Sequence, residues 1–299
     1  MPTGLILGLL ASFGWGALDI AVALSTRTVG TLRVLVGSQL VSLATLVILG
    51  LLQPVLLGTS PIEGMLAGFP LGLLAAVAYL SYFTALHLGP LSIVSPVVVA
   101  YGGLTVAAAV VLRGEVLSAP QVAGVLLVTA GVALAGLVIE SGDGRRMRLA
   151  SLGVAAAVVA LIGFAILTLL LADPIRAHGW LPVITGSRVG NSVGALTLLV
   201  LAVGTRSRRL APMLAPSLPW TRSVVVFVVL GGAFDVAAFV AYAIGLGIAP
   251  VWLIGLSSSL GPVLPVVYAI GWLGERPLPT QWAGLALIVG GMGVLALSG

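Results

Sequence analysis

The sequence has no cysteine and no lysine, and charged residues make up only 7% of its 299 residues. Without cysteine the chain cannot form disulfides or thiolate metal sites. Without lysine it cannot form a Walker A phosphate loop or a lysine Schiff base. A soluble globular protein carries roughly 25% charged residues, so this chain has too few polar residues to cover a water-facing surface.

Hydrophobic residues make up 60% of the sequence, and the mean hydropathy is +1.25. This composition predicts an integral membrane protein with the lipid bilayer as its main solvent. The net charge of +5 comes from arginine in loops, which suits contact with anionic lipid headgroups. Aromatic and basic residues do not alternate as they do in nucleic-acid-binding segments, so we expect no nucleic-acid partner.

Ten apolar runs approach the length of about 20 residues that a helix needs to cross the hydrocarbon core. The predicted spans are residues 4–26, 31–52, 64–87, 91–113, 120–139, 151–171, 181–203, 223–247, 251–273 and 280–298. A polar junction at 140–150 divides the chain into a first five-helix unit at 1–139 and a second at 151–299.

Several residues of the first unit recur in the second unit 160 positions later. The recurring residues are Tyr82, Pro90, Gly114-Glu115, Gln121, Gly124 and Gly131, matched by Tyr242, Pro250, Gly274-Glu275, Gln281, Gly284 and Gly291. Five spans are an odd number, so the second unit must enter the membrane with the opposite orientation. The sequence therefore predicts an all-α membrane protein of ten transmembrane helices, arranged as two inverted five-helix repeats with a site between them.

The order, spacing and duplication of these residues resemble the drug/metabolite transporter superfamily, in particular its ten-span EamA type. The resemblance also includes Trp15-Gly16 in the first span, with Arg33 and Arg188 early in spans two and seven. It implies a multi-pass carrier of the cell's inner membrane that moves amino acids, metabolites or drugs, often outward, through a central cavity. Asp19 and Asp235 depart from the family's pattern.

Four ionisable residues lie well inside the predicted spans, namely Asp19, Arg33, Arg188 and Asp235. Such a residue at the centre of a helix costs about 2.5–3.5 kcal/mol on insertion, so each should face a cavity or another charge. One alternative is that the aspartates form structural ion pairs with the arginines. For the two arginines we expect snorkelling to headgroups or loop carbonyls rather than contact with a ligand.

Each aspartate shares a helix face with aromatic residues, because residues three, four or seven positions apart lie on one side of a helix. Asp19 follows Trp15 by four positions, and Asp235 precedes Phe239 and Tyr242 by four and seven. A carboxylate beside aromatic rings attracts an organic cation through charge and cation–π contact. It also suits a proton carrier, so we expect Asp19 and Asp235 to couple transport to protons.

We expect the substrate to lie in a cavity lined by spans one to four and six to nine. The predicted substrate-binding residues are Trp15, Asp19, Tyr79, Asn191, Asp235, Phe239, Tyr242 and Ser258. Proline inside spans four and nine predicts gating hinges at Pro96, Pro262 and Pro265, with packing geometry as an equal alternative. Glu115 and Glu275 lie at helix ends in short turns, and we expect a capping role or a role in loop structure for both.

Spans five and ten are rich in glycine, which indicates close helix packing outside the cavity. We therefore expect a monomer, or a homodimer that forms through these two spans. The positive-inside rule places the termini outside the cell, because most loop arginines lie on the opposite side. The resemblance implies cytoplasmic termini instead, so orientation stays open.

The function that this pattern favours is secondary active transport of a small organic solute, driven by protons or by exchange. The alternative is a membrane subunit with a structural or assembly role and no transport, which has no reason to carry two aspartates in its spans. The chain shows no nucleophile–base pair and no His-Glu-x-x-His spacing, so we expect no enzyme activity, no metal and no cofactor.

Overall fold

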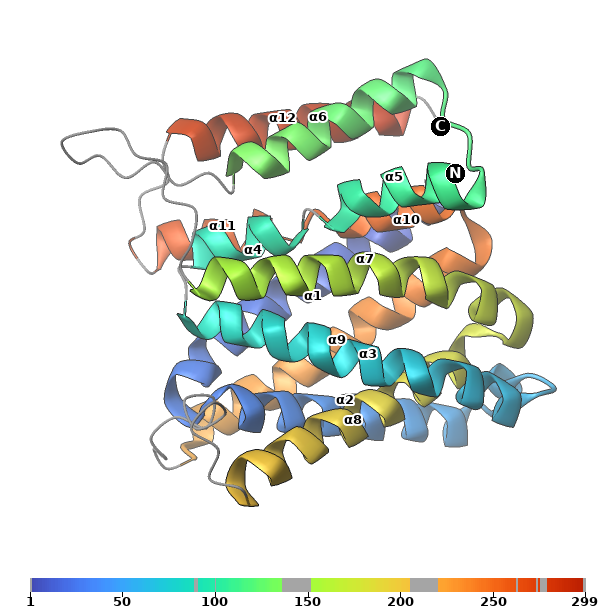
Figure 1. Ribbon diagram of the computed structural model, residues 1–299, viewed down its shortest axis with the longest axis vertical. Helices are drawn as coiled ribbons and strands as arrows, with labels where there is room; N and C mark the ends of the chain where they lie inside the picture. The colour runs from blue at the N-terminus through green and yellow to red at the C-terminus, as the bar shows by residue number, and fades with distance from the viewer. Residues whose placement is uncertain are drawn as a thin grey trace.

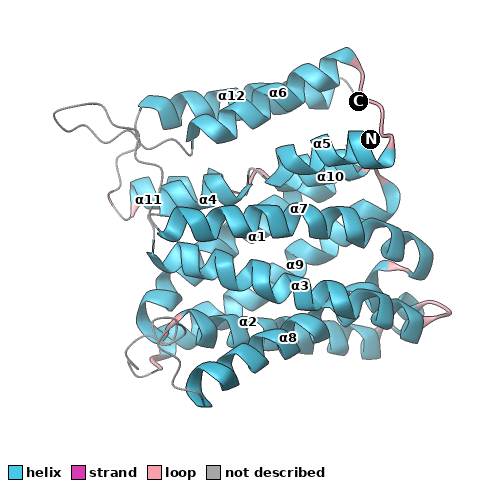
Figure 2. Ribbon diagram, viewed as in Figure 1, coloured by secondary structure: helices cyan, strands magenta, loops and turns pink. Residues whose placement is uncertain are grey.

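The protein is described by a computed structural model over residues 2–88, 91–99, 101–135, 152–204, 220–261, 263–272, 274 and 279–297. Within these ranges it is helical, with one 3-10 turn, η1 (Pro54–Leu57), and no strand (Figure 2). The α-helices are α1 (Pro2–Val29), α2 (Thr31–Leu52), α3 (Pro61–Leu88), α4 (Leu91–Val99), α5 (Tyr101–Arg113), α6 (Ala119–Ala135), α7 (Leu152–His178), α8 (Trp180–Gly204), α9 (Arg222–Ile248), α10 (Val251–Ser258), α11 (Val263–Gly271) and α12 (Pro279–Leu297). The predicted all-α class is confirmed, and the junction predicted at 140–150 lies outside the described residues.

Seven segments in the described part of the chain are long and apolar enough to cross a membrane. They are α1, α2, α3, α7, α8, α9 and a segment, Val251–Tyr268, that joins α10 to most of α11. The protein is thus a multi-pass helical membrane protein. Predicted spans five and ten correspond to the shorter helices α6 and α12.

Predicted span nine is divided into two helices, α10 and α11, by a turn at residues 259–261, and predicted span four corresponds to α4 and α5. At the end of α10 the hydroxyls of Ser257, Ser258 and Ser259 donate to backbone carbonyls three or four residues earlier. Such bonds offer those carbonyls partners other than the next helical turn. Pro265, the third residue of α11, has no N–H to donate and is tolerated in a first turn. These local features favour a new helix over a continuous span.

Two pairs of long helices are joined by a single glycine with left-handed backbone. Gly30, between α1 and α2, has φ 91°, and Gly179, between α7 and α8, has φ 86°. A residue with a Cβ is strained in this region, whereas glycine enters it freely. The chain therefore reverses direction within one residue, and the helices on either side lie close together.

The helices are stacked in pairs, with the cavity described below near the middle of the stack (Figure 1). At one end α6 lies beside α12, and at the other end α2 packs on α8. Between these ends, α1 packs along α9 and α7 packs along α3. A Cβ on Gly291 of α12 would lie 2.8 Å from the carbonyl oxygen of Gly124 in α6. At Gly291, the small-residue face of α12 therefore packs against α6 of the same chain.

Glu115 links the two halves of the sequence at the start of α10. Its carboxylate accepts hydrogen bonds from the backbone N–H groups of Val251 and Trp252, at 3.2 and 3.1 Å. A carboxylate there satisfies orphan donors and matches the positive end of the helix dipole. The capping role predicted for Glu115 is confirmed, whereas Glu275 lies outside the described residues.

Helices α3 and α8 approach each other closely because glycines alternate along their contact. A Cβ added to Gly72 of α3 would lie 2.0 Å from the carbonyl oxygen of Ser187. In the other direction, a Cβ on Gly190 of α8 would lie 2.1 Å from the carbonyl oxygen of Phe69. Backbone blocks both positions, so a side chain can be accommodated only if the helices separate.

We expect Gly190→Ala to lower the free energy of unfolding by about 1–3 kcal/mol, the usual cost of overpacking. The measurement is thermal unfolding of the purified protein in detergent. Gly204→Ala is the matched control, because no heavy atom lies within 4 Å of a Cβ added there. Equal melting temperatures for the two variants would show that α3 and α8 do not pack as described.

Candidate functional site

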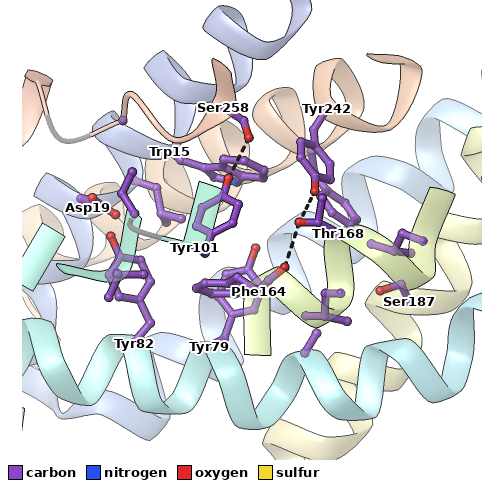
Figure 3. Close-up of a pocket in the computed structure, with 18 of the residues that line it drawn as sticks. Trp15, Asp19, Tyr79, Tyr82, Tyr101, Phe164, Thr168, Ser187, Tyr242 and Ser258 are labelled. Carbon is purple, nitrogen blue, oxygen red and sulfur yellow. Dashed lines mark hydrogen bonds between the residues drawn. The ribbon is translucent and has the colours of Figure 1, made fainter. Parts of the chain in front are cut away.

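A cavity lies among the helices α1, α3, α4, α5, α7, α8, α9 and α10, all of which contribute residues to its wall (Figure 3). Its wall is mainly aromatic and aliphatic. The lining residues are Trp15, Leu18, Asp19, Ala75, Tyr79, Tyr82, Val98, Val99, Tyr101, Phe164, Leu167, Thr168, Leu171, Ser187, Arg188, Phe239, Tyr242, Ser258 and Gly261. Apolar walls with a few polar groups are typical of small-molecule sites.

Asp235 of α9 is fully buried and accepts contacts from four other helices. Its carboxylate forms an ion pair with Arg188 at 3.0 Å and accepts a hydrogen bond from the Tyr79 hydroxyl at 2.9 Å. Ser42 donates at 3.1 Å and Trp15 at 3.3 Å, and the Gln39 amide donates at 3.4 Å. Both carboxylate oxygens are thus occupied, as a buried charge requires.

Arg188 is 2% exposed and lies in the same network. Its guanidinium donates to the side-chain oxygen of Gln39 at 2.6 Å, and its central carbon lies 4.4 Å from the centre of the Phe239 ring. The snorkelling predicted for Arg188 is therefore wrong, because Asp235 and Gln39 hold the guanidinium in the interior. Arg33 does behave as predicted, since it is partly exposed and donates to the carbonyl of Val29 at 3.4 Å.

Asp19 has far fewer partners than Asp235, although it is only 2% exposed. The Ser95 hydroxyl donates to one carboxyl oxygen at 2.7 Å. The other oxygen, Oδ1, has no hydrogen-bond partner among the described residues. The Tyr82 hydroxyl also lies beside this carboxyl group and interacts with it electrostatically (Figure 3). No salt bridge between Asp19 and Arg33 is present in the described part of the chain.

Two pairs of hydroxyl groups close other parts of the wall. Tyr242 donates to the Thr168 hydroxyl, which in turn donates to a carbonyl of α7 (Figure 3). Tyr101, the first residue of α5, shares a hydrogen bond of 2.7 Å with Ser258, the last residue of α10. These bonds join α7 to α9 and α5 to α10 across the cavity.

The structure brings six of the eight predicted substrate-binding residues to the cavity wall, namely Trp15, Asp19, Tyr79, Phe239, Tyr242 and Ser258. Asp235 and Asn191 lie behind the wall, where Asn191 donates to Gln39 at 2.8 Å. Helix α2, expected in the wall, instead supplies Gln39 and Ser42 to this hidden network.

The three predicted hinge residues lie in different settings. Pro96 falls inside α4, and Pro265 falls in the first turn of α11. Pro262 lies outside the described residues. Within the described part of the chain, no group of three or more His, Asp and Glu side chains could hold a metal ion.

The ion pair between Arg188 and Asp235 is the alternative that the sequence left open. Sequence reasoning missed Gln39, Tyr82, Tyr101, Phe164 and Thr168 as residues of the site. A signal for some of them is present, because Gly37-Ser38-Gln39 recurs as Gly186-Ser187-Arg188, 149 positions later. The same offset relates Trp15 to Phe164 and Asp19 to Thr168. The offset changes to 160 further along because the connection after α8 is longer than the one after α2.

The fold and the buried, charged cavity are those of a multi-pass helical membrane protein with a site for a small molecule. Residues 2–137, slightly less than half of the chain, match the EamA-like transporter family. A solved structure described as "Crystal structure of protein" shares 23% identity and a TM-score of 0.71, covering 99% of this chain and 97% of its own. This likeness concerns the fold alone. No curated protein matches the sequence.

Proposed function

We propose that the protein is a secondary active transporter that moves a small organic solute across the inner membrane. The observation that carries the proposal is the central cavity, which is lined by helices from both halves and contains the charged residues Asp19 and Arg188. A non-transporting membrane subunit offers no account of such a cavity, because buried charge in a bilayer is costly and is usually functional.

We propose further that the chain forms ten spans as two inverted repeats, with units at 1–139 and 151–299. Matching backbone features support this. The left-handed glycines Gly30 and Gly114 have counterparts in Gly179 and Gly274, which have nearly equal φ values. Packing also matches, since α1 lies against α9, α10 and α11, whereas α7 lies against α3, α4 and α5.

In this arrangement, reporter fusions at Gly299 and within the loop 204–222 should lie on opposite sides of the membrane. Three predicted spans separate the two positions, and an odd number of spans reverses the side. A pair of reporters active only outside and only inside the cell measures this directly. Detection of both positions on one side would contradict the ten-span arrangement.

We propose that Asp19 carries the coupling proton, whereas Asp235 serves as the structural centre of the buried network. Asp235 is held by Arg188 and four hydrogen-bond donors, so a change in its charge would leave a buried cation unpaired. Asp19 lines the cavity, and its Oδ1 has no hydrogen-bond partner among the described residues. Only Asp19 can therefore change its charge without disrupting the network.

The proposed function is tested with the purified protein in liposomes that contain a pH-sensitive dye. A gradient of a transported solute should drive proton movement in these liposomes, whereas protein-free liposomes should show none. A panel of amines, amino acids and sugars covers the solute classes in question. Solute movement without proton movement would leave a facilitator or an exchanger, and movement of neither would favour the structural-subunit alternative.

The oligomeric state is proposed to be a monomer, or a homodimer through spans five and ten, that is, α6 and α12. These helices contribute no residue to the described cavity wall. Because α6 and α12 already pack on each other at Gly291, a dimer would use their outer faces.

A further inference from the structure

The free oxygen of Asp19 is an unpartnered, buried acceptor that faces the same cavity as several aromatic rings. Ser95 donates to the other oxygen, and the Tyr82 hydroxyl lies beside the carboxyl group without a hydrogen bond to Oδ1. A buried carboxylate oxygen without a donor is costly. Asp235, by contrast, has donors on both oxygens, so the two aspartates differ in what they can still bind.

The charges of the lining residues do not cancel. Arg188 and Asp19 are the charged residues among those that line the cavity, and Arg188 is already neutralised by Asp235 at 3.0 Å. Asp19 therefore leaves one negative charge. A singly charged cation would balance it, whereas a zwitterion would leave one buried negative charge and an anion would leave two. Uncompensated charge is strongly disfavoured away from water.

The rings around Asp19 suit a cation attached to an apolar body. Trp15 lies one turn earlier on α1, and Tyr82 and Tyr101 lie on either side of Phe164, with ring centres 5.9 and 6.1 Å from it. Figure 3 shows these side chains gathered around one space. A cation near such faces gains cation–π attraction, and the rings offer apolar surface to the rest of the molecule.

Arg188 does not provide an equivalent site for a carboxylate. Its Nε has no partner in the described part of the chain, but its guanidinium pairs with Asp235 and lies over the Phe239 ring. A second carboxylate at Arg188 would lie beside that of Asp235, and like charges this close repel each other. The arrangement thus discriminates against amino acids.

We propose that Asp19 binds the ammonium group of the transported solute, which is a monovalent organic cation with an apolar body. The proposal rests on the transport function proposed above and names the substrate class of that same cavity. The ammonium N–H donates to Asp19 Oδ1, and the apolar part lies among Trp15, Tyr101 and Phe164. Because Asp19 also carries the coupling proton, solute and proton exchange for each other at one carboxyl group.

Four compounds with the same phenyl ring test the charge requirement by thermal unfolding of the purified protein, since a ligand of the folded state raises its melting temperature. They are 2-phenylethylamine, 2-phenylethanol, phenylalanine and 3-phenylpropionate. We expect the amine to stabilise the wild-type protein and to bind about 10- to 100-fold more tightly than the alcohol, the ratio for one hydrogen bond to a charged group. Equal behaviour of amine and alcohol, including no shift from either, overturns the proposal, as does tighter binding of phenylalanine.

Asp19→Asn should abolish the preference for the amine over the alcohol, because it keeps the shape of the side chain and removes its charge. Glu63→Gln is the matched control, since that carboxyl group is exposed and lies at the start of α3. If Asp19→Asn is unstable, the comparison of the four ligands on the wild-type protein still tests whether the cavity prefers a cation. An Asp19→Asn variant that keeps the preference contradicts the assignment.

The same ligands separate this inference from the proposed function. Binding of the amine without its movement into liposomes leaves the binding site intact and argues against transport. Movement of a neutral or zwitterionic solute, without binding of the amine, would support transport and would overturn the proposed substrate class.

Discussion

Arg188→Met should lower the free energy of unfolding by about 3–5 kcal/mol, the typical cost of removing one partner from a buried ion pair. The substitution leaves Asp235 fully buried with no cation, and it also removes a donor to Gln39. Thermal unfolding in detergent measures the effect. Arg33→Met is the matched control, because Arg33 is partly exposed and its one hydrogen bond among the described residues is a long one to a carbonyl.

The double variant Arg188→Met with Asp235→Leu distinguishes the lost ion pair from lost packing. Replacing both members of a buried pair by apolar residues is often neutral or stabilising, so we expect the double variant to be more stable than Arg188→Met alone. If the loss of stability in the double variant equals the sum of the losses in Arg188→Met and Asp235→Leu, Arg188 and Asp235 do not interact as the structure describes.

Asp19→Asn should lower uptake of a cationic solute and remove the dependence of the remaining transport on a pH gradient, while leaving the protein folded. The variant keeps an acceptor for Ser95 but cannot take up or release a proton. The other titratable side chains on the cavity wall are Arg188, which is ion-paired, and tyrosines, so none of them replaces this carboxyl group at neutral pH. The measurement is solute uptake into liposomes with and without an imposed gradient.

Asp235→Asn provides the contrast, because we expect it to reduce stability more than it changes the response to pH. It leaves Arg188 without its counter-charge in the interior. Glu63→Gln should leave both uptake and its response to pH unchanged. If Asp19→Asn responds to the gradient as the wild-type protein does, the coupling group must be sought elsewhere.

The helical class and the aromatic part of the cavity could be predicted because they depend on local patterns. Apolar run length identifies the spans, and a four-residue spacing is enough to place Trp15 and Asp19 on one face of α1. The same rule places Asp235 with Phe239, but it cannot show that the long side chains of Tyr79 and Arg188 stand between this carboxylate and the cavity. That arrangement depends on which helices pack together.

Arg188 is a second residue whose setting depends on which helices pack together and not on local sequence. Its position early in a predicted span favours snorkelling, and only contact with Gln39 and Asp235 overrides that preference. Its counterpart Gln39 becomes visible when the halves are compared at the offset of Gly30 and Gly179 rather than at that of the later spans. Because the connection after α8 is longer than the one after α2, a single offset of 160 does not align Gln39 with Arg188.

The turn at residues 259–261, which follows α10, bears on how this part of the cavity wall can move. Helix α5 packs on α10, and α4 packs on α11, so helices from different halves of the chain meet there. A continuous span would transmit a tilt at one membrane surface to the other, whereas a break absorbs the rotation locally. Glu115 is hydrogen-bonded to the first turn of α10, and Tyr101 is hydrogen-bonded to its last residue, Ser258. Helix α10 is therefore held at both ends by the first half of the chain, and the turn is the point at which it can rotate relative to α11.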